Sequence, residues 1–153
     1  MSSIDEVKEI KVSYKTEPGF PTVDPLTFIE NGDYVDLRAA CDIKMNKFDF
    51  TLIPLGVAIQ LPKNYYAIVV PRSSTFKKYG IIMANSIGII DESYCGDNDI
   101  WRFPALAMRE DVYIPFNERI AQFTIVEKSK FNITRVDMLN NDDRGGFGST
   151  GRQ

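Results

Sequence analysis

Apolar and polar residues alternate with a period of two along much of this chain. In VDLRAACDIK, residues 35–44, the apolar side chains at every second position are Val35, Leu37, Ala39, Cys41 and Ile43. LIPLGVAIQL, residues 52–61, repeats the pattern with Leu55, Val57, Ile59 and Leu61. Successive side chains of a strand point to opposite faces, so the alternation predicts strands that are buried on one face.

Further short apolar runs extend this pattern along the chain. AIVVP, IIMANSIGII and ERIAQFTIV are rich in β-branched residues, and turn-forming clusters such as ENGD, LPKN and CGDND separate the runs. Many short strands at this spacing indicate an all-β barrel or sandwich.

One segment predicts a helix instead. SSTFKKYG, residues 73–80, offers Ser73 or Ser74 as the N-cap, about two turns of helix, and Gly80 after the last turn. We therefore expect one short helix in a chain that is otherwise built from strands.

The end of the chain is polar and rich in glycine. DDRGGFGSTGRQ holds four glycines among its last nine residues, and a segment with so few apolar side chains cannot form a core of its own. We predict one domain over residues 1–140 and a mobile C-terminal arm over 141–153.

Composition narrows the possible chemistry. The 153 residues include no histidine and only two cysteines, and the formal net charge is −3. Histidine-dependent triads and histidine zinc sites are thus excluded, and carboxylates are the expected proton acceptors. The acidic balance argues against nucleic acid as a partner.

The location of the protein also follows from composition. No run of 18 apolar residues is present, the N-terminal MSSIDEVKEIKV is unlike a secretory signal, and two isolated thiols suit a reducing compartment. We expect a soluble, cytoplasmic protein without a membrane partner.

Four internal residues are candidates for chemistry, and each also has a structural interpretation. Asp91, in NSIGIIDESYCG, follows an apolar run and is equally an ordinary turn residue. Arg72 precedes the helix start, where an anion is favoured, or lies on the surface. Gln122 needs a polar partner within an apolar strand, and Asp36 lies on the polar face of its strand.

The tail carries a further candidate. In RGGFGSTG, residues 144–151, glycines let backbone amides approach a ligand, while Arg144 adds charge and two hydroxyls add donors. Phe147 is suited to stacking on a planar ligand, or to filling an apolar gap on a neighbour. The alternative is a disordered tail.

Taken in order, these stretches resemble the trimeric dUTPases. VDLRAA, PRSS, NSIGIIDESYCG, RIAQ and RGGFGSTG are similar to the five motifs of that family, and the short fifth motif is similar to those of Gram-positive prophages and phages. The resemblance implies a distorted β-barrel or jelly-roll-like fold with a flexible arm. It also implies hydrolysis of dUTP to dUMP and pyrophosphate, and a homotrimer with sites at subunit interfaces. For a phage-encoded chain, the location would be the host cytoplasm.

The resemblance assigns roles to the nucleoside-facing residues. Asp91 would activate the water that attacks the α-phosphorus, and Tyr94 would stack on the deoxyribose and exclude a 2′-hydroxyl. Asn85 would lie near the nucleoside, and the hairpin from Gly96 to Ile100 would read uracil through main-chain groups. Phe147 would cover the uracil ring.

The phosphate-facing residues follow in the same way. Asp36 would hold water in the shell of a Mg²⁺ ion that is bound mainly by the triphosphate. Phosphates or the attacking water would be held by Arg72, Ser73, Gln122 and Arg144, and the substrate-binding set also takes in Ser74, Gly148, Ser149 and Thr150.

Two other functions stay open from the sequence. A dCTP deaminase of the related fold also has Arg-Ser-Ser at its helix start, although the Asp91–Tyr94 segment is more similar to the hydrolase. A noncatalytic nucleotide-binding or regulatory module is compatible with Ser74-Thr75-Phe76 in the second motif and with the shortened fifth motif.

Overall fold

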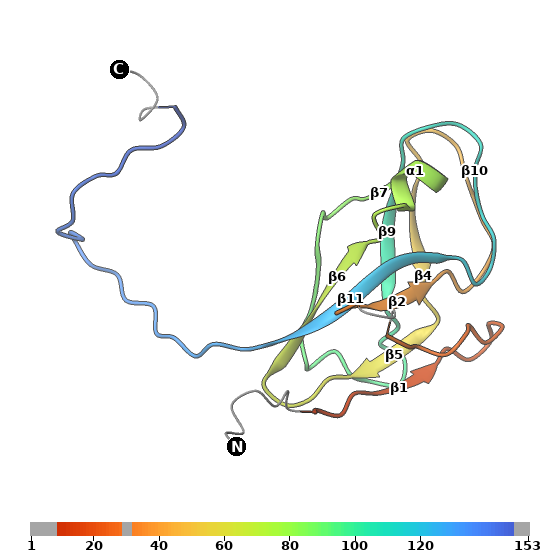
Figure 1. Ribbon diagram of the computed structural model, residues 1–153, viewed down its shortest axis with the longest axis horizontal. Coiled ribbons are helices and arrows are strands. Elements are labelled where there is room, and N and C mark those ends of the chain that lie inside the picture. The colour runs from red at the N-terminus through yellow and green to blue at the C-terminus, as the bar shows by residue number, and fades with distance from the viewer. Residues whose placement is uncertain (1–8, 29–31, 149–153) are drawn as a thin grey trace.

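The computed structural model describes residues 9–28 and 32–148, whose strands form four antiparallel sheets (Figure 1). The largest contains, in spatial order, β2 (Val35–Arg38), β11 (Arg119–Glu127), β6 (Tyr65–Pro71) and β8 (Gly88–Ile90). A second contains β4 (Phe50–Pro54), β9 (Arg102–Ala107) and β7 (Ile81–Met83). Two further pairs join β1 (Ser13–Thr16) with β5 (Val57–Gln60), and β3 (Ile43–Met45) with β10 (Val112–Ile114).

The all-β prediction is confirmed. The arrangement is jelly-roll-like with one short helix, and the sheets of the described residues stay open rather than closing into a barrel. In these residues no helix is long and apolar enough to cross a bilayer.

The sheets share one hydrophobic core. Phe103 and Ile53 from the three-stranded sheet are fully buried, as is Leu37 from the four-stranded sheet. The indole of Trp101, just before β9, meets the ring of Phe123 in β11 edge-on, with ring centroids 5.1 Å apart. The side chains predicted to be apolar and inward-facing in LIPLGVAIQL are all buried.

Two predicted continuous strands are interrupted. The pattern in residues 35–44 predicts one strand, but β2 ends at Arg38 and β3 begins at Ile43. Between them, the Ala39 amide bonds the Glu118 carbonyl and the Ala40 amide bonds the Pro54 carbonyl, so the chain passes from one sheet to another. Residues 52–61 also divide, at Gly56, whose φ of 73° is left-handed.

The sequence places Asp36 on the polar face of its strand, but that face is covered at this position. The residue is buried, with 9% of its surface exposed. Arginine side chains from distant segments cover it, and local alternation carries no information about such partners.

The predicted helix is present as α1 (Thr75–Tyr79), with Gly80 in the left-handed conformation at its C-terminus. Ser74 occupies the N-cap position but makes no side-chain capping hydrogen bond. The buried Thr75 joins the helix to its surroundings instead: its hydroxyl accepts from the Arg72 amide at 3.0 Å and donates to the Ile120 carbonyl at 2.8 Å.

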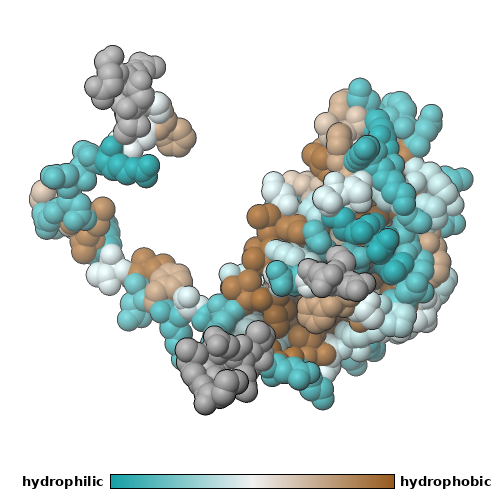
Figure 2. All heavy atoms as spheres, viewed as in Figure 1, coloured by the Kyte–Doolittle hydropathy of each residue, from teal (hydrophilic) through white to brown (hydrophobic). Residues whose placement is uncertain are grey.

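The C-terminal segment runs away from the body (Figure 1). After β11 ends at Glu127, residues 128–148 contain no helix or strand. Exposed apolar side chains, including Phe131 and Ile133, alternate with polar ones along it (Figure 2). The predicted arm, residues 141–153, is the outer part of this segment, and its last five residues lie outside the described chain.

Replacing Thr75 by Val tests the hydroxyl that ties α1 to β11. Valine fills the same volume but leaves the Arg72 amide and the Ile120 carbonyl unpaired, so we expect the free energy of unfolding to fall by about 1–3 kcal/mol. Urea denaturation measures the change. Ser74→Ala is the matched control and should cost less than about 0.5 kcal/mol because no capping bond is lost; equal losses in the two variants would contradict this account.

Candidate functional site

The loop after β8 holds Asp91 in a tight turn. The Tyr94 amide donates to the Asp91 carbonyl at 3.0 Å, and the Ser93 amide donates to Asp91 Oδ1 at 3.1 Å. The side chain of Asp91 is exposed, 62% of it to solvent. Asp91 is therefore a turn residue whose carboxylate is accessible for chemistry.

Beside this turn lies a cavity of about 570 Å³. Four residues predicted from the sequence line it: Asn85, Asp91, Tyr94 and Ile100. Much of the remaining wall is apolar, contributed by Val69, Met83, Trp101 and their neighbours. A mainly apolar cavity with a few polar groups at its edge suits a flat ligand that has a polar rim.

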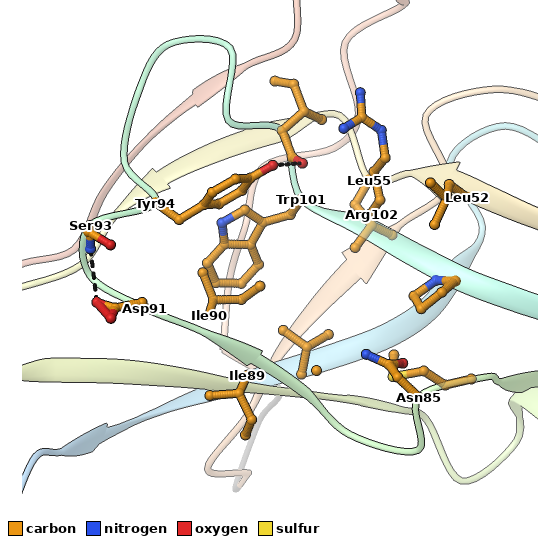
Figure 3. Close-up of a pocket in the computed structure, with 15 residues that line it drawn as sticks. Leu52, Leu55, Asn85, Ile89, Ile90, Asp91, Ser93, Tyr94, Trp101 and Arg102 are labelled. Atoms are coloured by element: carbon orange, nitrogen blue, oxygen red, sulfur yellow. Dashed lines mark hydrogen bonds between the residues drawn. The ribbon is translucent and has the colours of Figure 1, made fainter.

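Tyr94 and Trp101 both line this cavity (Figure 3). The Tyr94 hydroxyl donates to the Ile100 carbonyl at 3.2 Å, which fixes the orientation of the phenol ring. Gly96 does not line the cavity; its amide donates to Asp99 Oδ2 at 2.9 Å and shapes the loop between Tyr94 and Ile100. The exposed Cys95 also lies outside the lining.

A lysine holds the acidic pair at this turn. Lys128 Nζ lies 2.8 Å from Glu92 Oε1 and 3.3 Å from Asp91 Oδ1. The Ser93 amide and then Lys128 hold the pKa of Asp91 below its ordinary value. Lys128 and the Asn64 amide lower the pKa of Glu92, while Glu92 chiefly raises the pKa of Lys128. All three groups are thus charged at neutral pH.

A second polar cluster surrounds the buried Asp36. Arg72 Nε lies 3.1 Å from Asp36 Oδ1, and Arg119 Nη1 lies 3.4 Å from Oδ2. The approach of Arg72 is an ion pair without hydrogen-bond geometry, so Oδ1 is buried with no hydrogen-bond partner among the described residues. Gln122 is opposite Asp36 in the strand register, and its side-chain amide donates to the Pro71 carbonyl at 3.3 Å.

The two clusters lie at opposite ends of β6. On β6, Ala67 pairs with Ile90, so Asp91 follows near Tyr66, whereas Arg72 comes directly after the other end. Six residues at about 3.3 Å each separate these ends by about 20 Å. One chain therefore does not bring Asp91 and Arg72 to the same small ligand.

The remaining predicted residues join neither cluster. Ser73 and Ser74 are exposed beside Arg72. Arg144, Phe147 and Gly148 lie on the extended tail, away from the body (Figure 1), and Phe147 is fully exposed. Ser149 and Thr150 are outside the described residues.

Sequence reasoning missed three charged residues at these clusters, Glu92, Arg119 and Lys128. Glu92 directly follows Asp91 in the chain. Arg119 immediately precedes the Ile-Ala-Gln run, so its place beside Gln122 was available from the motif. Lys128 follows the last residue of β11 and has no local signal, because its partners are 36 and 37 residues away in the chain.

Sequence comparisons match this chain to a family model and to a named relative. The family model for dUTPase matches residues 34–151. The chain is 51% identical over 144 residues to the SPbeta prophage-derived deoxyuridine 5'-triphosphate nucleotidohydrolase YosS of Bacillus subtilis, covering 94% of this chain and 98% of that protein.

Two solved structures are similar in fold. One is the Staphylococcus bacteriophage 80alpha dUTPase with dUPNHPP, with a TM-score of 0.76 at 18% identity, covering 93% of this chain and 99% of the other. The other is a mutant dUTPase from phage phi11 of S. aureus, described with a structural Mg(II) ion, with a TM-score of 0.69 at 13% identity, covering 86% of this chain and all of the other.

Replacing Asp36 by Asn tests the buried ion-pair cluster. The variant leaves Arg72 and Arg119 without their shared carboxylate, and we expect the free energy of unfolding to fall by about 1–3 kcal/mol, less than for a fully buried pair because both arginines are partly exposed. Guanidinium denaturation measures the loss. Asp24→Asn, which removes the exposed partner of Arg38, should cost less than about 1 kcal/mol. A larger fall in the free energy of unfolding for Asp24→Asn than for Asp36→Asn would contradict the conclusion that the Asp36 ion pairs stabilise the fold more.

Proposed function

The chain belongs to the dUTPase family, and we propose that it hydrolyses dUTP to dUMP and pyrophosphate by attack of a water on the α-phosphorus. The observation that carries the proposal is the exposed Asp91 carboxylate at the rim of a mainly apolar cavity. The 51% identity to a named nucleotidohydrolase over nearly the whole chain supports the same reaction.

The cavity beside Asp91 receives the deoxyuridine. Its apolar wall buries the faces of the base, and main-chain groups between Gly96 and Ile100 satisfy the uracil edge. Tyr94 is held by its bond to the Ile100 carbonyl and packs on the deoxyribose, which leaves no room for a 2′-hydroxyl. Asn85 lines the same cavity and contacts the nucleoside.

Asp91 is the general base. Its carboxylate is ionised at neutral pH, and the bonds from the Ser93 amide and Lys128 both end on Oδ1. Oδ2 is then the oxygen better placed to accept the proton of the attacking water. A carboxylate with a lowered pKa is a weak base, so alignment of the water supplies much of the rate.

The Asp36 cluster serves the phosphates. Arg72 neutralises negative charge as the transition state forms, with Ser73 near the leaving oxygen and Gln122 holding a phosphate or water. Arg119, which shares Asp36 with Arg72, keeps that carboxylate neutralised when Arg72 turns toward substrate.

The polar side chains around Asp36 fit a magnesium ion that is bound mainly by the triphosphate. Among the described residues, no group of three acidic or thiol side chains could form a protein cage for a metal. Asp36 Oδ1 is buried, has no hydrogen-bond donor within the described part of the chain, and can accept from a water in the shell of the ion. Mg²⁺ commonly keeps several waters beside substrate phosphates, and it would supply charge neutralisation there.

The family resemblance implies a homotrimer, and the geometry of β6 supports sites that are shared between subunits. Because Asp91 and Arg72 lie about 20 Å apart in one chain, a triphosphate that touches both must bridge two subunits. Exposed apolar side chains on β4, β7 and β8, such as Leu52, Ile82 and Ile89, supply surface for association.

The arm closes the site. Arg144 adds a phosphate contact and Phe147 covers the uracil, while Gly148 lets the backbone approach the phosphates. Positive φ at Gly145 and Gly148 suits a backbone that wraps closely around a ligand. The proposal includes a cytoplasmic location, consistent with two unpaired thiols.

Asp91→Asn tests the proposed base. The variant keeps the size and turn-forming capacity of the side chain but cannot accept the proton, so pyrophosphate release from dUTP should fall by at least about 10²-fold. Binding of a nonhydrolysable dUTP analogue, measured by calorimetry, should change less than about threefold, or 0.7 kcal/mol.

Asp24→Asn is the matched control, because Asp24 is an exposed carboxylate that lies outside both the cavity lining and the proposed uracil-binding hairpin. It should retain wild-type turnover. Removal of the 4-amino group of dCTP by the wild type, or hydrolysis of UTP by the wild type as fast as that of dUTP, would contradict the proposed substrate. Wild-type turnover by Asp91→Asn would contradict the proposed base.

A further inference from the structure

Lys128 occupies a fixed position where three segments meet. Its backbone amide donates to the Asn64 carbonyl at 2.8 Å, directly after the last β11–β6 pair, Glu127 with Tyr65. The Asn64 amide donates to Glu92 Oε2 at 3.1 Å. The turn before β6, the loop after β8 and the start of the C-terminal segment are thereby linked.

The side chain of Lys128 points from this anchor to the proposed base. Nζ reaches both Glu92 Oε1 and Asp91 Oδ1, and only 33% of the side chain is exposed. A lysine that is free in solvent has a large rotamer entropy, which two carboxylates and a fixed backbone reduce here. The ammonium group is therefore a defined contact on one oxygen of the base.

We propose that Lys128 is a positioning residue for the reaction, which holds the Asp91 carboxylate by Oδ1 so that Oδ2 is presented to the attacking water. The inference rests on the proposed function of Asp91. Lys128 itself touches no substrate, and it acts through the carboxylate that does.

Charged groups around Asp91 affect its pKa, so the pH dependence of dUTP hydrolysis tests the proposed role of Lys128. Among the described residues, the ionic groups that interact with Asp91 are Lys128 and its neighbour Glu92, while Ser93 contributes chiefly through its backbone amide and to a smaller extent through its side chain. The cation favours the ionised carboxylate and so lowers the pKa of Asp91. Removing it raises that pKa, and a larger fraction of Asp91 is then protonated at mildly acidic pH.

The experiment compares pH profiles of dUTP hydrolysis for the wild type, Lys128→Met, Lys128→Arg and Lys130→Met. In Lys128→Met, the acid limb of kcat should move to higher pH, and kcat above the limb should fall by about threefold to tenfold, a part of the contribution of a positioned base. KM for dUTP should change less than twofold, by about 0.4 kcal/mol or less. Lys128→Arg should keep most of the wild-type kcat and an acid limb close to that of the wild type.

Lys130→Met is the matched control, because it removes an exposed cation two residues away that forms no ion pair with the described carboxylates. An unmoved acid limb in Lys128→Met would overturn the proposal, as would an equal shift in Lys130→Met. A change confined to KM would also overturn it, since that result means Lys128 only anchors the arm.

A second measurement separates this inference from the proposed function. The carboxyl carbon of Asp91, followed by NMR during acid titration, should titrate at higher pH in Lys128→Met than in the wild type. If the wild type hydrolyses no dUTP, the proposed function fails while this titration still tests the contact. If Lys128→Met does not fold, Lys128→Gln replaces it, and coincident titration curves contradict the proposal.

Discussion

The seven-residue strand β6 is the element on which the proposed site depends. It pairs with β8 along one edge and with β11 along the other, so it fixes the position of the loop that carries Asp91 and of the strand that carries Gln122. Because Asp91 lies near its start and Arg72 directly after its end, the same pairing that builds the sheet also separates the proposed base from the arginine that is proposed to bind phosphate. A rigid paired strand cannot shorten, and a second chain is then the simplest way to complete the site.

The two ends of β6 differ in how they hold charge. At the Arg72 end, the buried Asp36 carboxylate is shared by two arginines, and the Arg72 backbone amide donates to the Thr75 hydroxyl. At the Asp91 end, the exposed Asp91 and the partly buried Glu92 are both held by Lys128. In the proposed function, the first arrangement holds two arginines in place for the phosphates. The second keeps a carboxylate accessible to water while fixing its orientation.

Much of this architecture was predictable from the sequence, and the exceptions have a common cause. Alternation identified the strands and the buried Leu55, Val57, Ile59 and Leu61, since these properties depend on neighbours in the chain. The order of the motifs identified the candidates Asp91, Arg72 and Gln122. The burial of Asp36 and the contacts of Lys128 depend on partners 36 or more residues away. Ser74 makes no capping bond, and the hydroxyl that secures the helix start is that of Thr75, whose acceptor is the distant Ile120 carbonyl.

The account predicts that no single chain contains a complete site, and mixed oligomers test this most directly. Asp91→Asn and Arg72→Gln chains would be co-refolded at equal amounts, with each variant refolded alone for comparison, and pyrophosphate release from dUTP measured. Each variant alone should be nearly inactive. The mixture should recover activity in about one quarter of its sites, those that combine an intact Asp91 with an intact Arg72 from another chain. A mixture as inactive as its parents, in oligomers verified to contain both chains, would contradict the central claim.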